Sequence, residues 1–294
     1  MTKRNLFVAG LFSVLIAAPG AALADPPGIG CSVTVQQLGE AHVSPYNALL
    51  RSEYVEPIRL RLWNRGDAAC SGTLTIRNSF GDADLVRAQG GELNYVIVDE
   101  RDRSFVIFDP ATNDGVPIPV AIPANKSIDV QPRFVVPGGQ AGRAGRYASI
   151  VEARFREDGH VDDELGDVSL AVEVQPSAQA NFVGYGENAT LDLGELIPGK
   201  SDSIGLQIRA SADVDVQVSS EAHGKLVQTT GASIPYAITV DGSPVDLSAP
   251  NMLEIPLADS VRGQTMPVQV MVGDFENAPV GHYRDVVTFR ISAK

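Results

Sequence analysis

Apolar and polar residues alternate along most of the chain, which is the two-residue period of half-buried β-strands. Five clear examples are residues 58–62, 168–174, 204–208, 214–218 and 268–272. No window of more than ten residues beyond the first segment shows the 3.6-residue apolar spacing of a helix. Asp241-Gly242, between apolar stretches, is typical of a two-residue hairpin turn. The pattern predicts an all-β protein of antiparallel sandwiches.

An internal repeat predicts two similar domains. Residues 85–97 resemble 226–238 at a displacement of 141, residues 145–155 resemble 281–291 at 136, and residues 122–123 resemble 255–256 at 133. The three matches keep the same order, and loop-length changes between copies would produce the drift in displacement. We expect a first sandwich over residues 25–166 and a second over residues 167–294.

Residues 1–24 have the pattern of a secretory signal peptide. Lys3 and Arg4 precede an apolar run over residues 6–18, and the small-residue site Ala22-Leu23-Ala24 follows. The run is shorter than the roughly 20 residues that a bilayer-spanning helix needs. We expect cleavage before Asp25 and export of a soluble remainder that does not span a membrane.

An exported protein reaches an oxidising compartment, in which a pair of cysteines can form a stable disulfide. Cys31 and Cys70 are the only cysteines, so they are expected to form a disulfide. A metal site needs three or four ligands, and the four histidines are scattered, so we expect no metal or other cofactor there. The acidic loop over residues 157–167 is either a calcium site or a solvated turn, and the turn is the favoured interpretation.

Charge and motifs exclude several functions. The formal net charge of −13 makes the chain a poor partner for nucleic acids or anionic lipids. Residues 194–201 match the nucleotide-binding pattern GxxxxGK[ST], but an alternating strand follows where that site needs a helix, so we expect no nucleotide. Residues 65–67 read Arg-Gly-Asp and are expected to form a turn. No nucleophile elbow or similar motif is present, so we do not expect an enzyme.

The two copies differ at their ends. After residue 155 the first copy continues into the alternating residues 168–174, whereas the second copy reaches the equivalent strand at 283–291 with nothing left to lie beside it. A missing strand would leave unpaired backbone groups and an apolar groove, which another chain could fill by β-augmentation. Alternatively, residues 168–174 serve the second sandwich, which then closes with fewer strands.

The second half resembles the spore coat protein U-like domain, the subunit fold of archaic chaperone–usher pili. Residues 191–194, 197–199 and 204–208 carry this resemblance, as does the closing stretch 279–287 with its Gly-x-Tyr-x-Asp turn. The likeness covers about residues 167–294, although this half lacks the disulfide that the family often has. The resemblance implies an incomplete immunoglobulin-like sandwich. It also implies a periplasmic pilus chaperone, an outer-membrane usher and an adjacent pilin subunit as partners, with transit through the periplasm to a cell-surface pilus.

From these observations we expect a partner-strand groove in the second sandwich, lined by Val168, Leu170, Val172, Tyr283, Val287, Phe289 and Ile291. Residues 25–30 contain two prolines and two glycines, which makes a poor donor strand and favours a tip adhesin. Expected adhesive loops of the first sandwich carry Tyr46, Phe80, Val135 and Val136, whereas Trp63 is expected in the core. The alternative is an extracellular tandem β-sandwich binding module, for example for carbohydrate, outside any fibre.

Overall fold

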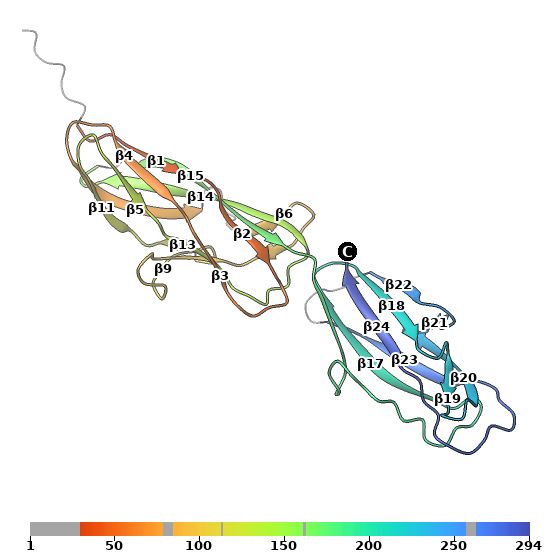
Figure 1. The fold of residues 1–294 in the computed structure, drawn as a ribbon. Coiled ribbons are helices and arrows are strands. Elements are labelled where there is room, and N and C mark those ends of the chain that lie inside the picture. The colour runs from red at the N-terminus through yellow and green to blue at the C-terminus, as the bar shows by residue number, and fades with distance from the viewer. Residues whose placement is uncertain (1–29, 79–84, 113, 161–162, 257–262) are drawn as a thin grey trace, which may run out of the picture.

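The structure, a computed structural model, describes residues 30–78, 85–112, 114–160, 163–256 and 263–294. Within these ranges the chain consists of strands joined by turns and irregular segments, without any helix. Two elongated β-sandwiches follow one another along the chain (Figure 1). Each has its own apolar core. The all-β expectation is therefore confirmed.

The first sandwich contains one large sheet that faces two smaller ones across the core. The large sheet has the order β11 (Ile118–Ile122), β5 (Cys70–Asn78), β14 (Gly145–Glu157), β15 (Asp163–Val174), β2 (Ala41–Tyr46), with β6 (Leu85–Arg87) on β14 and β7 (Glu92–Leu93) on β6. One small sheet has the order β1 (Val33–Gln37), β4 (Leu60–Asn64), β12 (Ser127–Val130). The other has the order β10 (Asp114–Gly115), β9 (Val106–Asp109), β8 (Val96–Val98), β13 (Arg133–Val136), β3 (Tyr54–Pro57).

The second sandwich is built of two sheets. The larger has the order β16 (Ala178–Phe182), β17 (Ser201–Ala210), β23 (Gln264–Val272), β20 (Ser233–Val240), β19 (Lys225–Val227), with β21 (Ser243–Val245) also on β20. The smaller has the order β22 (Asn251–Ile255), β18 (Val214–Ser220), β24 (Val287–Ala293). Asp241 and Gly242 both have positive φ between β20 and β21, as the two-residue hairpin signal predicted.

Strand pairing repeats between the sandwiches at the displacements seen in the sequence. Ala148 of β14 pairs with Val86 of β6, and their counterparts Arg284 and Val227 form an isolated antiparallel bridge. The Tyr147 hydroxyl donates to the carbonyl of Arg143, four residues earlier, and the counterpart Tyr283 hydroxyl donates to the carbonyl of Pro279. Strands β14 and β24 therefore occupy equivalent positions, next to β5 and β18 respectively.

Strand β15 belongs entirely to the first sandwich. It pairs antiparallel with all but the last residue of β14, from Gly145–Val174 to Arg156–Asp163, and its other edge pairs in parallel with β2. The boundary expected between residues 166 and 167 falls inside this strand and is wrong. The linker lies instead at residues 175–177, where the buried Ser211 hydroxyl donates to the carbonyl of Gln175. Because β15 follows β14 closely in the sequence, the two strands form a hairpin at a low entropic cost of loop closure. This explains why β15 joins the first sandwich.

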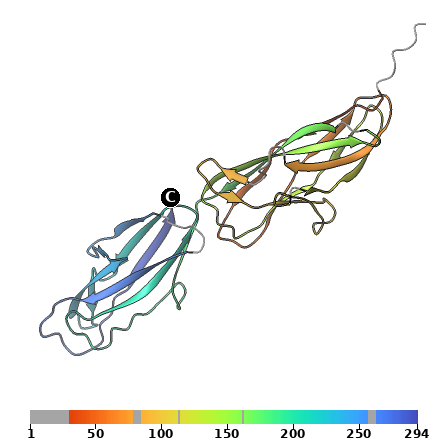
Figure 2. The same cartoon turned by 180° about the vertical axis from the view of Figure 1, so that it is seen from behind.

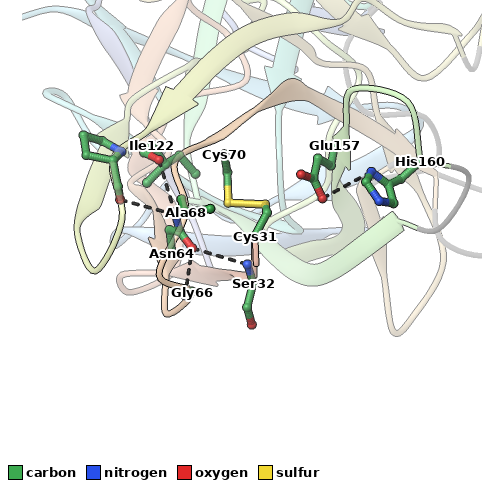
Figure 3. The surroundings of a disulfide bond; sticks show 10 residues. Cys31, Ser32, Asn64, Gly66, Ala68, Cys70, Ile122, Glu157 and His160 are labelled. Atoms are coloured by element: carbon green, nitrogen blue, oxygen red, sulfur yellow. Dashed lines mark hydrogen bonds and ion pairs between the residues drawn. A yellow bond between two sulfur atoms is a disulfide. The ribbon is translucent and has the colours of Figure 1, made fainter. Parts of the chain in front are cut away.

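The Cys31–Cys70 disulfide is confirmed, and it ties the start of β1 to the start of β5. Beside it, the fully buried Asn64 amide links three segments (Figure 3). Its Oδ1 accepts from the backbone N–H groups of Ser32 and Gly66, at 3.3 and 2.9 Å. Its Nδ2 donates to the carbonyl of Ala68 at 2.7 Å, and to those of Ile122 and Pro123 at 3.3 Å. This end of the sandwich is therefore organised by one polar side chain.

Replacing Asn64 by alanine should destabilise the first sandwich, because several buried backbone groups lose their only side-chain partner. We expect a loss of about 3 kcal/mol in the free energy of unfolding. Trp63 is the single tryptophan of the chain, so thermal unfolding followed by its fluorescence reports on this sandwich. The exposed Ser127→Ala is the control, with an expected change within about 0.5 kcal/mol. Equal unfolding temperatures for the two variants would contradict this role of Asn64.

Candidate functional site

The outer edge of β24 has no strand beside it within the described residues, since β24 pairs with β18 alone. In the first sandwich the equivalent β14 has β5 and β6 on one side and β15 on the other. The consequence appears in side-chain burial. Tyr147, Val151 and Phe155 of β14 are at most 2% exposed. Their counterparts Tyr283, Val287 and Ile291 are only half-buried.

An open groove of about 1070 Å³ lies along this edge of the second sandwich. Its floor includes Leu206, Ile238 and Val268 from the larger sheet, and β24 forms one wall with Phe289 and its neighbours. The opposite wall comes from β16 and from the segment 187–196. Phe182 of β16 meets Phe289 edge-on, with ring centroids 5.9 Å apart, so the two walls touch at this point. The groove therefore has apolar side chains on its floor and both polar and apolar groups along its walls, and it is bordered by edge strands of two different sheets.

One carboxylate anchors the chain where it enters β24. Asp285 Oδ2 accepts hydrogen bonds from the hydroxyls of Ser220 and Tyr236, both at 2.5 Å. Its Oδ1 accepts from the backbone N–H groups of Ala222 and Val286, at 3.0 and 2.7 Å. These bonds join β18, β20 and the start of β24, and they hold the groove-lining strand in place without help from a neighbour on its open side.

Burial raises the pKa of the Tyr236 hydroxyl well above its usual range, and the hydrogen bond to the Asp285 carboxylate raises it further. The pKa values of Tyr46 and Tyr147 in the first sandwich are also raised, chiefly by burial. All three phenols are therefore held neutral as hydrogen-bond donors, with Tyr46 donating to the carbonyl of Pro137.

The structure divides the residues that the sequence assigned to the groove. Tyr283, Val287, Phe289 and Ile291 line it. The prediction is wrong for three others, which are fully buried in the first core on β15: Val168, Leu170 and Val172. Sequence reasoning missed the wall formed by Phe182, Phe275 and the segment 187–196. Part of that segment, residues 191–194, had carried the family resemblance without being assigned to the groove.

The expected adhesive loops are not surface loops. Tyr46 and Val136 are fully buried and Val135 is 8% exposed, because β13 is a central strand and Tyr46 packs against Tyr54. Phe80 lies outside the described residues. Trp63, expected in the core, is instead 48% exposed, since the alternation of β4 turns Leu60, Leu62 and Asn64 inward.

Other motifs take the forms that their surroundings impose. The GxxxxGK[ST] match ends where β17 begins, so the chain supplies a strand in place of the required helix. Residues 65–67 connect β4 to β5. Within the described ranges, no group of three or more potential ligand side chains is placed to hold a metal ion. Of the stretch 157–167, which was expected to be a loop, residues 163–167 instead form the start of β15. No described helix has the length and apolarity to cross a membrane. The signal-peptide residues lie outside the described ranges.

No family model and no curated protein matches this chain, so the spore coat protein U-like assignment stays a prediction. Among solved structures, a chain of the CsuC–CsuE chaperone–tip adhesion subunit complex from Acinetobacter baumannii archaic Csu pili is similar at 16% identity. That match covers 90% of this chain and 100% of that one with a TM-score of 0.46.

Two further similar structures are adhesins. The CupB6 tip adhesin of Pseudomonas aeruginosa shows 12% identity over 90% of this chain and 94% of that one, with a TM-score of 0.39. CfaE, the adhesive subunit of the CFA/I fimbria of enterotoxigenic Escherichia coli, shows 10% identity over 89% and 81%, with a TM-score of 0.40. Because all three TM-scores are below 0.5, we infer the function of this chain from its own strand pairing and groove.

Removal of the Asp285 carboxylate should destabilise the second sandwich selectively. Asp285→Ala leaves the buried Tyr236 hydroxyl and the Ser220 hydroxyl without their acceptor, and we expect a loss of about 3 kcal/mol in the free energy of unfolding. Calorimetry should show the effect, while the Trp63 fluorescence transition of the first sandwich stays in place. The control is the exposed Asp246→Ala, which loses only local hydrogen bonds to Ser248. A shift of the Trp63 transition instead would show that Asp285 acts elsewhere.

Alkaline pH should destabilise the protein through its buried tyrosines. Their folded pKa values are raised, so the stability they provide is complete below the unfolded value of about 10 and is lost as pH rises above it. Tyr236→Phe should lower the stability of the second sandwich at neutral pH. It should also flatten its further decline above about pH 10, as measured by calorimetry across that range. A decline as steep as in the unsubstituted chain would rule out Tyr236 as its source.

Proposed function

We propose that the second sandwich accepts a β-strand from another polypeptide and that the chain is a subunit of a chaperone–usher pilus, placed at its tip. The observation that carries this proposal is the contrast between β14 and β24. On one side, β14 pairs with β5 and β24 pairs with the equivalent strand β18. The groove-facing side chains of β24 are nevertheless half-buried, whereas the equivalent side chains of β14 are buried. An unpaired strand edge beside apolar side chains is costly in water and is a template for β-augmentation.

The first sandwich shows how such a strand would lie. Strand β15 runs antiparallel to β14 and turns four alternate aliphatic residues into the core: Val168, Leu170, Val172 and Val174. These pair with Val151, Ser149, Tyr147 and Gly145, whose counterparts in the groove are Val287, Asp285, Tyr283 and Gly281. The incoming strand should therefore run antiparallel to residues 281–291 and carry aliphatic side chains at every second position.

The open groove also implies that different partners occupy it one after another during assembly. An open apolar groove is an aggregation hazard while the subunit waits for its neighbour. A periplasmic chaperone that lends a strand would cover it, and the adjacent pilin would replace that strand at the outer-membrane usher. The chain would then reside on the cell surface after transit through the periplasm.

Two features favour the tip. The stretch before β1 contains Pro26, Pro27, Gly28 and Gly30, which suit neither the hydrogen bonding nor the alternation of a donor strand. In addition, the two sandwiches lie end to end in both views, and β1 and β4 are at the end of the first sandwich that is remote from the second (Figures 1 and 2). A fibre attached through the second sandwich would present that remote end to a target surface.

Strand acceptance can be tested with a peptide copied from β15, residues 163–174. The peptide is added to the protein that begins at residue 25. At a concentration one hundred times its Kd it should stabilise the second sandwich by about 2.7 kcal/mol, which calorimetry would detect as a higher unfolding temperature. The Trp63 fluorescence transition should not move, because the first sandwich already holds its own β15. A peptide of the same composition with the alternation broken is the ligand control.

A pair of variants on neighbouring positions of β24 sharpens the test. Phe289→Glu places a charge in the groove and should abolish the stabilisation, whereas Arg290→Glu changes an exposed residue that does not line the groove and should retain it. If neither a β15 peptide nor a pilin N-terminal peptide stabilises the chain, the fibre function is wrong. The protein is then a tandem β-sandwich binding module outside a fibre.

A further inference from the structure

The outward face of the small sheet β1–β4–β12 carries the only tryptophan of the chain among polar side chains. Cross-strand pairing places six residues in two rows on this face: Thr34, Trp63 and Ser127 in one row, and Gln36, Arg61 and Asp129 in the other. The inward residues of the same strands, such as Leu60 and Leu62, are buried in the core. The two rows therefore form a small platform, with the indole in the middle of one row.

The indole is available to a ligand. Trp63 is 48% exposed, although a tryptophan in a sheet usually gains more by burial. Arg65 lies over the ring with its guanidinium carbon 5.9 Å from the ring centroid, and the ring keeps its 48% exposure with this contact in place. The disulfide and Asn64 stiffen the backbone immediately next to it. A rigid, exposed aromatic face costs little to order when a partner binds.

The side chains around the indole can donate and accept hydrogen bonds in one plane. Arg61 and Asp129 form a bidentate pair at 2.8 and 2.9 Å, so each is held in position while keeping further hydrogen-bonding capacity. Thr34, Gln36 and Ser127 are exposed, and within the described part of the chain their side chains make no hydrogen bond. The platform spans about 10 Å across the strands and about 7 Å along them.

We propose that this platform binds a pyranose ring of a carbohydrate. A pyranose has one face of C–H groups, which would pack on the indole, and a rim of hydroxyl groups, which both donate and accept hydrogen bonds. Hydroxyl, amide, guanidinium and carboxylate groups surrounding an aromatic ring match that combination. A purely apolar partner would leave the polar groups around Trp63 unpaired. The site lies on the first sandwich and does not depend on strand acceptance by the second.

Because Trp63 is the only tryptophan, its fluorescence reports on this site alone. The full chain from residue 25 should be titrated with the methyl glycosides of glucose, galactose and mannose and with N-acetylglucosamine. We expect a saturable change in emission with at least one of them, at a Kd near the millimolar range of a small ligand. Saturation-transfer NMR should then show the strongest transfer to the ring C–H protons of the bound sugar.

Variants separate the stacking and hydrogen-bonding contributions, with NMR as the readout where the fluorophore is removed. Trp63→Ala should abolish saturation transfer, and Gln36→Ala should weaken binding by about two- to tenfold. Tyr185→Ala removes another exposed aromatic, on the second sandwich, and should leave binding unchanged. The Trp63→Ala chain should retain its calorimetric transitions, which excludes unfolding as the cause of lost binding.

The proposal is overturned if none of the four sugars gives a saturable change up to about 50 mM, well above a millimolar Kd. It is equally overturned if Trp63→Ala binds as well as the unsubstituted chain. Quenching of Trp63 by a hydrophobic dye without any response to sugars would assign the platform to an apolar partner instead. Sugar binding in a chain that fails to respond to the β15 peptide would support this site and reject the fibre, so the two proposals fail separately.

Discussion

An antiparallel sandwich is stable when both edges of its layers are paired or covered, because backbone N–H and C=O groups and the apolar face beneath them are otherwise exposed to water. The first sandwich meets this requirement along β14, where β15 supplies the hydrogen bonds and covers the core. The second sandwich does not meet it along β24 within the described residues. The half-buried side chains, the groove and the inferred need for a partner strand all follow from this one difference.

Because the two sandwiches are related by an internal repeat, equivalent positions in them can be compared directly. At the equivalent strands β14 and β24, the first copy has β15 along the outer edge, whereas the second copy has no strand there within the described residues. The difference in burial at these positions follows from that neighbour. Asp285 shows how the incomplete copy remains ordered. Its four accepted hydrogen bonds fix the entry into β24 from the side of β18 and β20, where the first copy relies on a neighbouring strand as well. The polar anchor and the open apolar groove are thus two parts of one arrangement.

The two sandwiches use their surfaces differently. The first is closed, carries the disulfide and Asn64 at its remote end, and presents an aromatic platform beside them. The second is open and presents an apolar groove. A rigid closed domain suits recognition of a target because little order is lost on binding, whereas an open domain suits assembly because a partner strand completes its core. This division is consistent with a fibre subunit that joins its neighbour through one domain and meets a surface through the other.

Local sequence pattern determined much of this protein. The two-residue alternation set the all-β class and located β4, β15, β17, β18 and β23, two lone cysteines set the disulfide, and Asp241-Gly242 set its hairpin, because each depends on near neighbours or on simple counting. The displacements of the repeat also identified Tyr283, Val287 and Ile291 as groove residues. Tertiary structure alone decided which sandwich owns β15, which face of β4 carries Trp63, and that Tyr46 and Val136 are core. Which sandwich a strand joins, and which of its faces points to the core, depend on pairing between distant segments. Alternation within one strand does not distinguish between these alternatives.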